Sequence, residues 1–335
     1  MRILSEVIAG LLLLLLALWM AAGIYFWLGW PEAFRTALAI ITIPFLLILW
    51  FLPRSVATPP RWIRRGVVLV LIAVFFTAYF SKSPYPRDWV PLHDELALAQ
   101  IDSDLVTISN FRRALHYPDG RAPDIVWEER TFDLSQLTGA EIILQPFGES
   151  ELTVHVLVTF TFADGNNLAA SVEARRVTWE YFDALAGFFR SEQLYIVLGS
   201  ETDLFGKRLA NEEELQIYQT QANLPLVRAY LETLLSFTND IHTEPAFYST
   251  ISESCLTTLL KLSPEFNQQV SLFDYRRWVP GYALGLFQEI GLVDNSISET
   301  ELKASATLDP TVTQPFEYEG SEQEWSAYIR QNLGV

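Results

Sequence analysis

The chain has 335 residues, of which 50% are hydrophobic and 19% charged, and this balance excludes an intrinsically disordered protein. Residues 1–80 hold six basic and two acidic residues, which leaves 17 basic and 38 acidic residues in 81–335, a net charge of −21 that excludes nucleic acid as a partner. The single cysteine, Cys255, excludes intramolecular disulfides, a four-thiolate zinc site and an iron–sulfur cluster.

Three apolar runs without a charged residue, 7–29, 36–52 and 66–80, predict a three-helix transmembrane region over residues 1–80. The first run is long enough to cross about 30 Å of hydrocarbon, and the other two need a few flanking residues. A cleavable signal peptide is the alternative for the first run. It is disfavoured because the apolar stretch continues from Ile24 to Leu28, past the small residues that cleavage requires.

The arginines between the apolar runs predict the orientation. The loop 53–65 contains four arginines and no acidic residue, whereas the loop 30–35 contains one charge of each sign. The loop 53–65 is therefore expected in the cytoplasm, with the amino terminus on the same side. This places residues 81–335 outside, as a domain on the outer face of a cytoplasmic membrane that the chain crosses several times.

The exported part begins with residues 81–103, whose prolines predict a tether. Alternating apolar residues then predict strands at 105–110, 125–132, 142–147, 152–162 and 168–176, with shorter candidates at 194–198 and 215–218. Asp164, Gly165, Asn166 and Asn167 are turn formers, so the strands 152–162 and 168–176 are expected to form a hairpin.

Helical spacing of apolar residues predicts four helices in the exported part. They are expected at 178–190, from Pro225 to about 237, from Ser252 or Ser254 to before Pro264, and at about 322–331. Residues 104–335 are therefore expected to form one α+β domain.

Cys255 is the first candidate for chemistry. Ser252 or Ser254 is suited to cap a helix that begins at the cysteine, and the backbone N–H groups of a first turn favour a thiolate and lower the thiol pKa. A nucleophilic cysteine needs this environment. The alternative is a buried cysteine that acts as a small apolar side chain, as most free cysteines do.

Among four histidines, His155 has the most informative context, because it lies in the apolar strand 152–162 and is suited to act as the base for a thiol. Ser171, Glu173 and Arg175 alternate along the next strand and share one face. Glu173 is expected to orient His155, and Arg175 to hold Glu173 or a substrate phosphate. The alternatives are a core histidine and a solvated sheet face. His93 lies in the expected tether, His116 beside a turn and His242 in a loop.

Other catalytic designs are not supported. The sequence has no HExxH motif, no calcium loop and no GxSxG motif, so neither a metal site nor a cofactor is expected. Glu201, Asp203 and Arg208 form a local charge cluster of the kind that is more often structural than catalytic.

From about Leu105 to Leu292 the sequence resembles the N-terminal periplasmic domain of the bacterial lipoprotein N-acyltransferase Lnb. The matching residues, in chain order, are His155, Phe160, Phe162 and Gly165; Ser171, Glu173 and Arg175; Glu201, Asp203 and Arg208; Tyr248, Thr250, Ser254, Cys255 and Thr257; and Pro280, Gly281 and Tyr282. The resemblance implies a Cys–His site and acyl transfer onto lipoproteins. The order of His before Cys is also similar to that of permuted papain-like acyltransferases, which implies a papain-like α+β domain.

Three functions follow as hypotheses. The first is a membrane-tethered acyltransferase acting on membrane lipids or lipoproteins, with Cys255, His155 and Glu173 as catalytic residues and Arg175, Ser171 and Tyr248 binding substrate. The second is a cell-envelope cysteine peptidase or amidase with the same dyad and water as acceptor. The third is a non-catalytic envelope module in which Cys255 belongs to the core. The sequence does not specify the acyl donor, the acceptor or the oligomeric state.

Overall fold

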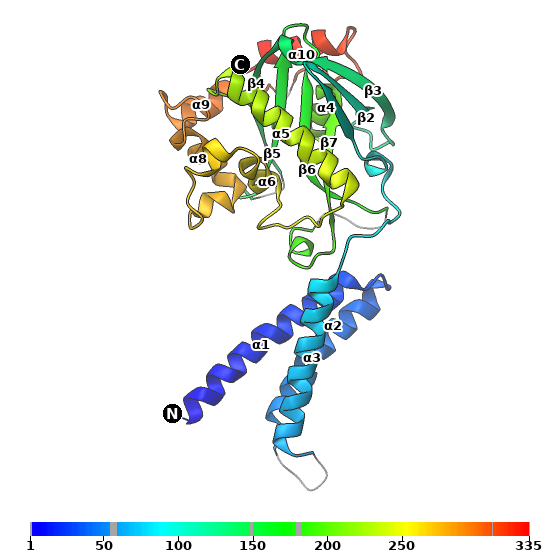
Figure 1. Cartoon of the computed structure of the whole chain (residues 1–335), viewed down its shortest axis with the longest axis vertical. Coiled ribbons are helices and arrows are strands. Elements are labelled where there is room, and N and C mark those ends of the chain that lie inside the picture. Colours follow the sequence, from blue (N-terminus) through cyan, green and yellow to red (C-terminus); the bar gives the residue numbers. More distant parts are fainter. Residues whose placement is uncertain (1, 54–58, 148–149, 179–182, 310, 335) are drawn as a thin grey trace. The chain divides into compact units, whose positions relative to one another are not determined.

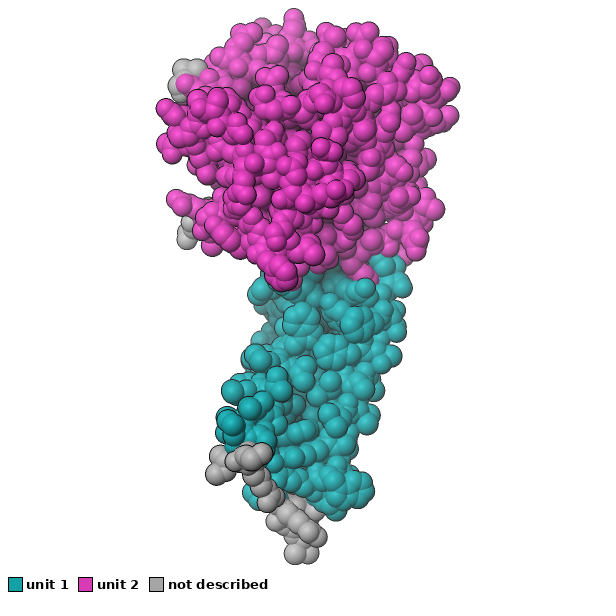
Figure 2. All heavy atoms as spheres, turned by 60° about the vertical axis from the view of Figure 1, so that its left-hand side comes forward, with its two compact units in different colours: residues 1–85, 182–192 teal, residues 86–181, 193–335 magenta. Residues whose placement is uncertain are grey.

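The structure is a computed structural model that describes residues 2–53, 59–147, 150–178, 183–309 and 311–334 (Figure 1). Contacts divide the chain into two compact units, which Figure 2 shows in different colours. The first unit consists of residues 1–85 and 182–192, and the second of 86–181 and 193–335.

The first unit contains three long apolar helices, α1 (Arg2–Trp27), α2 (Glu32–Phe51) and α3 (Arg61–Ser81). Each is long and apolar enough to cross a membrane, since 20 residues of helix span about 30 Å. The three predicted spans are confirmed, and each helix begins a few residues before its apolar run. Pro44 lies inside α2.

Arginines in the first turns of α3 stabilise the neighbouring helices. The guanidinium of Arg64 is buried and donates to the carbonyls of Leu49 (3.4 Å) and Leu52 at the end of α2. A positive charge there satisfies free carbonyls and compensates the helix dipole. Arg65 pairs with Glu6 of α1 at 2.7 Å. Arg54, the fourth arginine behind the predicted orientation, lies outside the described residues.

The segment 183–192 also belongs to the first unit. The ring of Phe189 lies 4.6 Å from that of Trp19 and 5.4 Å from that of Phe26, both on α1. Tyr79 donates to the carbonyl of Phe188 at 2.9 Å. The helix expected at 178–190 is wrong in its described part, which contains only a short 3-10 turn, η3 (Ala186–Phe188). Phe189 has its packing partner on α1, so the apolar residues do not need a helix to be buried.

In the described part of the second unit, eight strands form one mixed sheet in the order β1-β2-β7-β6-β5-β4-β8, with β3 paired to β2. The strands are β1 (Leu98–Asp102), β2 (Leu105–Leu115), β3 (Asp124–Asp133), β4 (Leu137–Pro146), β5 (Val154–Phe162), β6 (Leu168–Arg175), β7 (Gln193–Gly199) and β8 (Gln216–Gln219). The seven predicted strands are present, and the β5–β6 hairpin is confirmed, with Gly165 at a φ of 78° in its turn.

Helices cover both faces of this sheet (Figure 1). The α-helices are α4 (Glu201–Ala210), α5 (Leu224–Thr243), α6 (Cys255–Lys261), α7 (Pro264–Asn267), α8 (Ala283–Glu289), α9 (Glu299–Ala306) and α10 (Glu322–Gln331). The 3-10 turns are η1 (Pro91–His93), η2 (Leu134–Gln136), η4 (Tyr275–Arg277) and η5 (Pro280–Tyr282). Helices α5, α6 and α8 pack in one apolar cluster with alternate strand residues such as Val156, and α4 and α10 pack in a second cluster with Leu157. The domain is therefore a mixed α/β domain with two helical layers.

Three elements differ from the sequence-based expectations. The segment 81–103, expected to be a tether, contributes η1 and the edge strand β1 to the second unit. Helix α4 lies where the sequence indicated only a charge cluster, and α9 lies where no helix was expected. Charged residues at both ends of α4 leave only a narrow apolar stripe, but nine of its ten residues are buried.

One glycine fixes the junction between β2 and β7, which are joined at the single pair Arg112 and Gly199. A Cβ at Gly199 would lie 2.6 Å from the Arg112 carbonyl oxygen, and backbone cannot move away cheaply. We therefore expect Gly199→Ala to destabilise the protein by about 1–3 kcal/mol. Gly139→Ala is the matched control, because its Cβ would meet only Thr161 Oγ1 at 3.5 Å. Urea denaturation of the detergent-solubilised protein, followed by circular dichroism, measures the difference; equal midpoints would contradict this account of the junction.

Candidate active site

Cys255 is the first residue of α6, as predicted. The side chain of Ser254 accepts a hydrogen bond from the N–H of Thr257 at 3.3 Å, and the Thr257 side chain accepts from the Ser254 N–H at 2.9 Å. This reciprocal capping box fixes the start of the helix. The cysteine is only 6% exposed and packs in the apolar cluster with Val156.

The environment of the thiol differs from the expectation. Burial raises the pKa of Cys255, although the N–H groups of Val156, Leu256 and Cys255 itself act in the opposite direction. The predicted lowering of the thiol pKa is therefore wrong. The N–H groups of the first turn are present as expected, but removal of the sulfur from water outweighs them. The resting cysteine is a neutral thiol.

His155 lies on β5, and its hydrogen bonds define its tautomer. Its Nε2 lies 2.8 Å from Ser171 Oγ, and Ser171 Oγ lies 3.0 Å from Glu173 Oε1. An ionised carboxylate only accepts, so Ser171 donates to Glu173 and accepts from His155 Nε2–H. Nδ1 is then the nitrogen with a free lone pair. Burial, and after it the charge of Arg208, lower the pKa of His155 to about 3, so the imidazole is neutral at physiological pH.

Glu173 is the centre of the polar cluster. Its Oε1 accepts from Arg208 Nη2 at 3.2 Å and lies 3.9 Å from His155 Nε2, so it reaches the imidazole through Ser171. Burial on its own would raise the pKa of Glu173, but Lys207, His93 and Arg208 hold it well below its usual range. The carboxylate stays charged although it is largely buried.

Two further members of this cluster were not chosen from the sequence. His93 is 1% exposed; its Nδ1 accepts from the backbone N–H of Arg176 at 2.9 Å, and its Nε2 lies 3.5 Å from Glu173 Oε2. Burial lowers the pKa of His93 to about 4 and that of Lys207 to about 8, although the charge of Glu173 opposes both changes. No sequence pattern around His93 indicates that it belongs to this cluster. Lys207 and Arg208 do have such a context, because they lie in the last turn of a helix that follows a buried strand.

Arg175 lies on the predicted face but does not pair with Glu173. Its Nε donates to the His93 carbonyl at 2.8 Å and its Nη2 to the Asp94 carbonyl at 2.6 Å. Its guanidinium lies over the ring of Trp89 at 4.4 Å. Arg175 therefore holds the segment that carries His93, and the cation on Glu173 is Arg208.

A second buried ion pair holds α4 in place. Arg112 on β2 pairs with Asp203 through two hydrogen bonds of 2.7 and 3.2 Å, and His116 Nε2 lies 2.9 Å from the same carboxylate. Both partners of the ion pair are 0% exposed. A bidentate pair of this kind fixes the direction of the helix, and with it the position of Arg208.

Cys255 and His155 approach the same stretch of β5 from different directions. Val156 packs in the cluster with Cys255, and alternation along β5 directs His155 to the α4 side, where it meets Ser171. The β5–β6 ladder ends at the pair Leu157 and Ser171, two residues after His155, and the N–H of Val156 is directed at the sulfur. The thiol and the imidazole thus flank the same stretch of strand. Their hydrogen bond remains a prediction.

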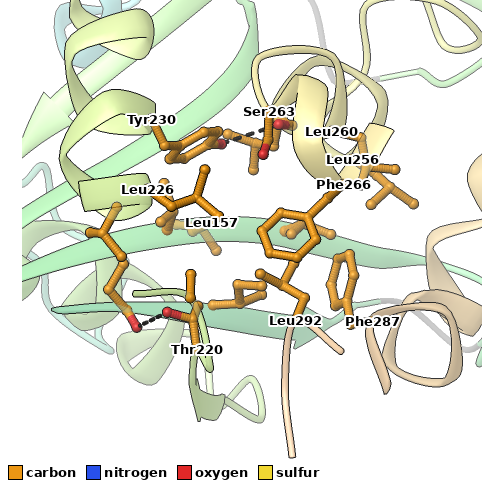
Figure 3. Close-up of a pocket in the computed structure, with 17 residues that line it drawn as sticks. Leu157, Thr220, Leu226, Tyr230, Leu256, Leu260, Ser263, Phe266, Phe287 and Leu292 are labelled. Atoms are coloured by element: carbon orange, nitrogen blue, oxygen red, sulfur yellow. Dashed lines mark hydrogen bonds between the residues drawn. The ribbon is translucent and has the colours of Figure 1, made fainter. Parts of the chain in front are cut away.

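An apolar cavity is lined by residues of strands β4 and β5 and of the helices that cover them (Figure 3). Cys255 does not line it, but Leu256, the next residue of α6, does; the volume open to the centre of a water-sized sphere is about 70 Å³. Side chains from β4, β5, α5, α6, α7 and α8 line it, and Figure 3 labels Leu157, Thr220, Leu226, Tyr230, Leu256, Leu260, Ser263, Phe266, Phe287 and Leu292. Val156 and Leu256, the neighbours of His155 and Cys255 along the chain, are both lining residues.

Comparison with known proteins identifies this part of the chain. Residues 124–281 match the family model described as the Lnb N-terminal periplasmic domain. They are an Lnb N-terminal periplasmic domain. No curated protein and no solved structure matches the chain. With three N-terminal spans and a periplasmic domain, the chain is a multi-pass protein of the bacterial cytoplasmic membrane.

The matched segment contains most of the cluster. Cys255, His155, Ser171, Glu173 and Arg208 lie within the Lnb domain, whereas His93 and Arg112 precede it. Tyr248 also lies within it and packs, 7% exposed, in the same apolar cluster as Cys255. The roles assigned to these residues remain predictions.

Acid is expected to destabilise the domain through His93. Its pKa is about 4 when folded and 6.5 when unfolded, so below 6.5 the unfolded chain binds a proton that the folded one does not. Stability therefore falls as the pH is lowered from about 6.5 to about 4, by about 3 kcal/mol from this group. Urea denaturation at several pH values measures it. His93→Gln should make the dependence less steep, with the contribution of His155 remaining, and His242→Gln, at an exposed position on α5, should leave it unchanged; equal slopes in wild type and His93→Gln would refute it.

Proposed function

We propose that this protein is a membrane-tethered cysteine acyltransferase that acts on lipid or lipoprotein acyl esters through a thioester at Cys255. The observation that carries this proposal is the apolar cavity lined by Leu256, the residue next to Cys255, because its lining is mainly aliphatic and aromatic side chains. A hydrocarbon chain gains free energy from such a cavity, whereas an extended peptide would leave its backbone N–H and C=O groups without partners there.

The proposed reaction has two steps. The sulfur of Cys255 attacks the carbonyl carbon of an ester while its proton passes to His155 Nδ1, and the C–O bond breaks as the alcohol leaves with that proton. An amine then attacks the thioester carbonyl, the C–S bond breaks, and the thiol returns to its resting form. His155 acts as base and then as acid in each step.

Glu173 is proposed to orient His155 through Ser171, because the chain of hydrogen bonds from carboxylate to hydroxyl to imidazole fixes Nε2 as the protonated nitrogen. Arg175 and Tyr248 are also proposed to contribute to substrate binding. Arg175 would do so indirectly, by holding the segment that carries His93. A His-bearing strand followed by a Cys-bearing helix corresponds to a permuted papain-like arrangement, which is the finer fold that we propose.

A peptidase or amidase would use the same two residues with water as acceptor. The apolar cavity favours acyl transfer, and the identity of the acceptor distinguishes the two reactions. In a non-catalytic module, the cysteine would be an inert core residue.

A thioester at Cys255 is directly measurable. Membranes containing the wild-type protein should yield a Cys255 peptide with an acyl mass that hydroxylamine removes. Cys255→Ser should abolish this adduct, since an alcohol is a far weaker nucleophile, and His155→Ala should slow its formation at least about 100-fold. Glu173→Gln should reduce the rate less, because it leaves both reacting groups in place. Full activity in Cys255→Ala would exclude the mechanism.

The cavity can be tested separately from the thiol. Ala222 lines the cavity and is partly exposed, so Ala222→Trp should fill space without disturbing a buried core. We expect it to reduce acylation of Cys255 by phospholipids with 16-carbon chains at least about tenfold, and by six-carbon analogues much less. Ala229→Trp, at an exposed position of α5, is the control. Equal loss with both chain lengths would show that the cavity does not hold the acyl chain.

A further inference from the structure

The segment 271–282 of the second unit carries an unusual set of exposed apolar side chains, and we call it the aromatic loop. Leu272 is 67% exposed, Phe273 98%, Tyr275 59% and Tyr282 43%. Soluble surfaces rarely gather large apolar side chains in one place, and such patches commonly mark an interaction site.

The aromatic loop has a defined conformation. Trp278 Nε1 donates to the Leu272 carbonyl at 3.2 Å, and the rings of Tyr275 and Tyr282 lie 5.2 Å apart, nearly perpendicular to each other. Two short 3-10 turns, η4 and η5, fall inside the loop. The structure therefore holds Phe273 out in solvent while its neighbours are fixed.

One of the two arginines of the loop is paired with carboxylates, whereas Nε of the other, Arg277, has no hydrogen-bond partner among the described residues. Arg276 pairs with Asp274 and with Glu289, each at 2.6 Å. Arg277 is buried, with its guanidinium near the ring of Trp278. The exposed tip, Leu272 and Phe273, carries no charged side chain. Insertion of this tip into an apolar medium would leave no unpaired charge behind.

The aromatic loop is connected to the strand that carries His155. The N–H of Gly281 donates to the carbonyl of Leu152 at 3.1 Å, and a Cβ at Gly281 would lie 2.2 Å from the Glu151 carbonyl oxygen. Leu152, which is 47% exposed, therefore extends the apolar surface to a point three residues before His155.

We propose that the aromatic loop docks into the outer leaflet of the membrane that anchors the chain, with Leu272 and Phe273 entering the acyl region and Tyr275, Trp278 and Tyr282 at the level of the headgroups. Three chain connections, at 85/86, 181/182 and 192/193, join its unit to the unit with the membrane spans. Aromatic side chains beside aliphatic ones are typical of the membrane interface. Since residues 81–335 have a net charge of −21, apolar burial and not attraction to anionic lipid drives the contact. This inference does not rest on the proposed function.

The single cysteine makes a direct test possible. In full-length protein with Cys255→Ala, Phe273→Cys is labelled with a nitroxide in phosphatidylcholine nanodiscs, and its accessibility to oxygen and to a water-soluble nickel complex is measured. Ile101→Cys, on the edge strand β1 and 42% exposed, is the matched control. We expect the ratio of oxygen to nickel accessibility to be at least about threefold higher at 273, because an interfacial segment enters the acyl boundary by several ångströms.

Each other outcome decides against the proposal. Equal ratios at 273 and 101 would show a loop in water. Low access to both reagents would indicate coverage by protein, and a high ratio that appears only with anionic lipid would show electrostatic binding.

Discussion

The buried carboxylate of Glu173 is the constraint on which the candidate site depends. A charge removed from water costs several kcal/mol unless it is paired and hydrogen-bonded. Arg208, Ser171 and His93 surround this carboxylate, and the ammonium of Lys207 adds a further positive charge. Each of these groups is in turn positioned by other contacts, so the geometry around His155 is set by the need to compensate one negative charge.

The compensation reaches across the domain. Arg208 also donates to Gln145 on β4 at 3.0 Å and to the carbonyl of Leu204 at 2.7 Å, which leaves its guanidinium little freedom. The pair Arg112 and Asp203 holds the beginning of the same helix. Arg175 holds the segment that brings His93 to the cluster. The orientation of His155 is thus a property of the packed sheet and α4, and not of the hairpin alone.

Local patterns were sufficient to predict part of this site. Alternation along β6 placed Ser171, Glu173 and Arg175 on one face, the turn around Gly165 predicted the hairpin, and the serine before Cys255 predicted the capped helix. Each of these signals acts over a few residues of the chain. The arginine that pairs with Glu173 could not be predicted in this way. The expected partner, Arg175, is two residues from Glu173 along the chain, whereas the actual partner, Arg208, is 35 residues away. His93 reaches the cluster only because η1 and β1 fold onto the unit. Phe189 finds its partner on α1, which no helical periodicity of 178–190 indicates.

The pKa of the thiol shows why a local argument fails even where the local structure is right. Helix N–H groups face the sulfur as predicted, but the pKa of Cys255 is raised because the residue packs in an apolar cluster. The pKa of His155 is lowered for the same reason. Both changes favour uncharged partners, so the resting site contains a thiol and a neutral imidazole and not an ion pair. If the proposed chemistry holds, proton transfer must accompany attack on the ester, when charge moves from the sulfur to the developing oxyanion. Under that proposal, such a site contains no buried thiolate that the resting domain would have to stabilise.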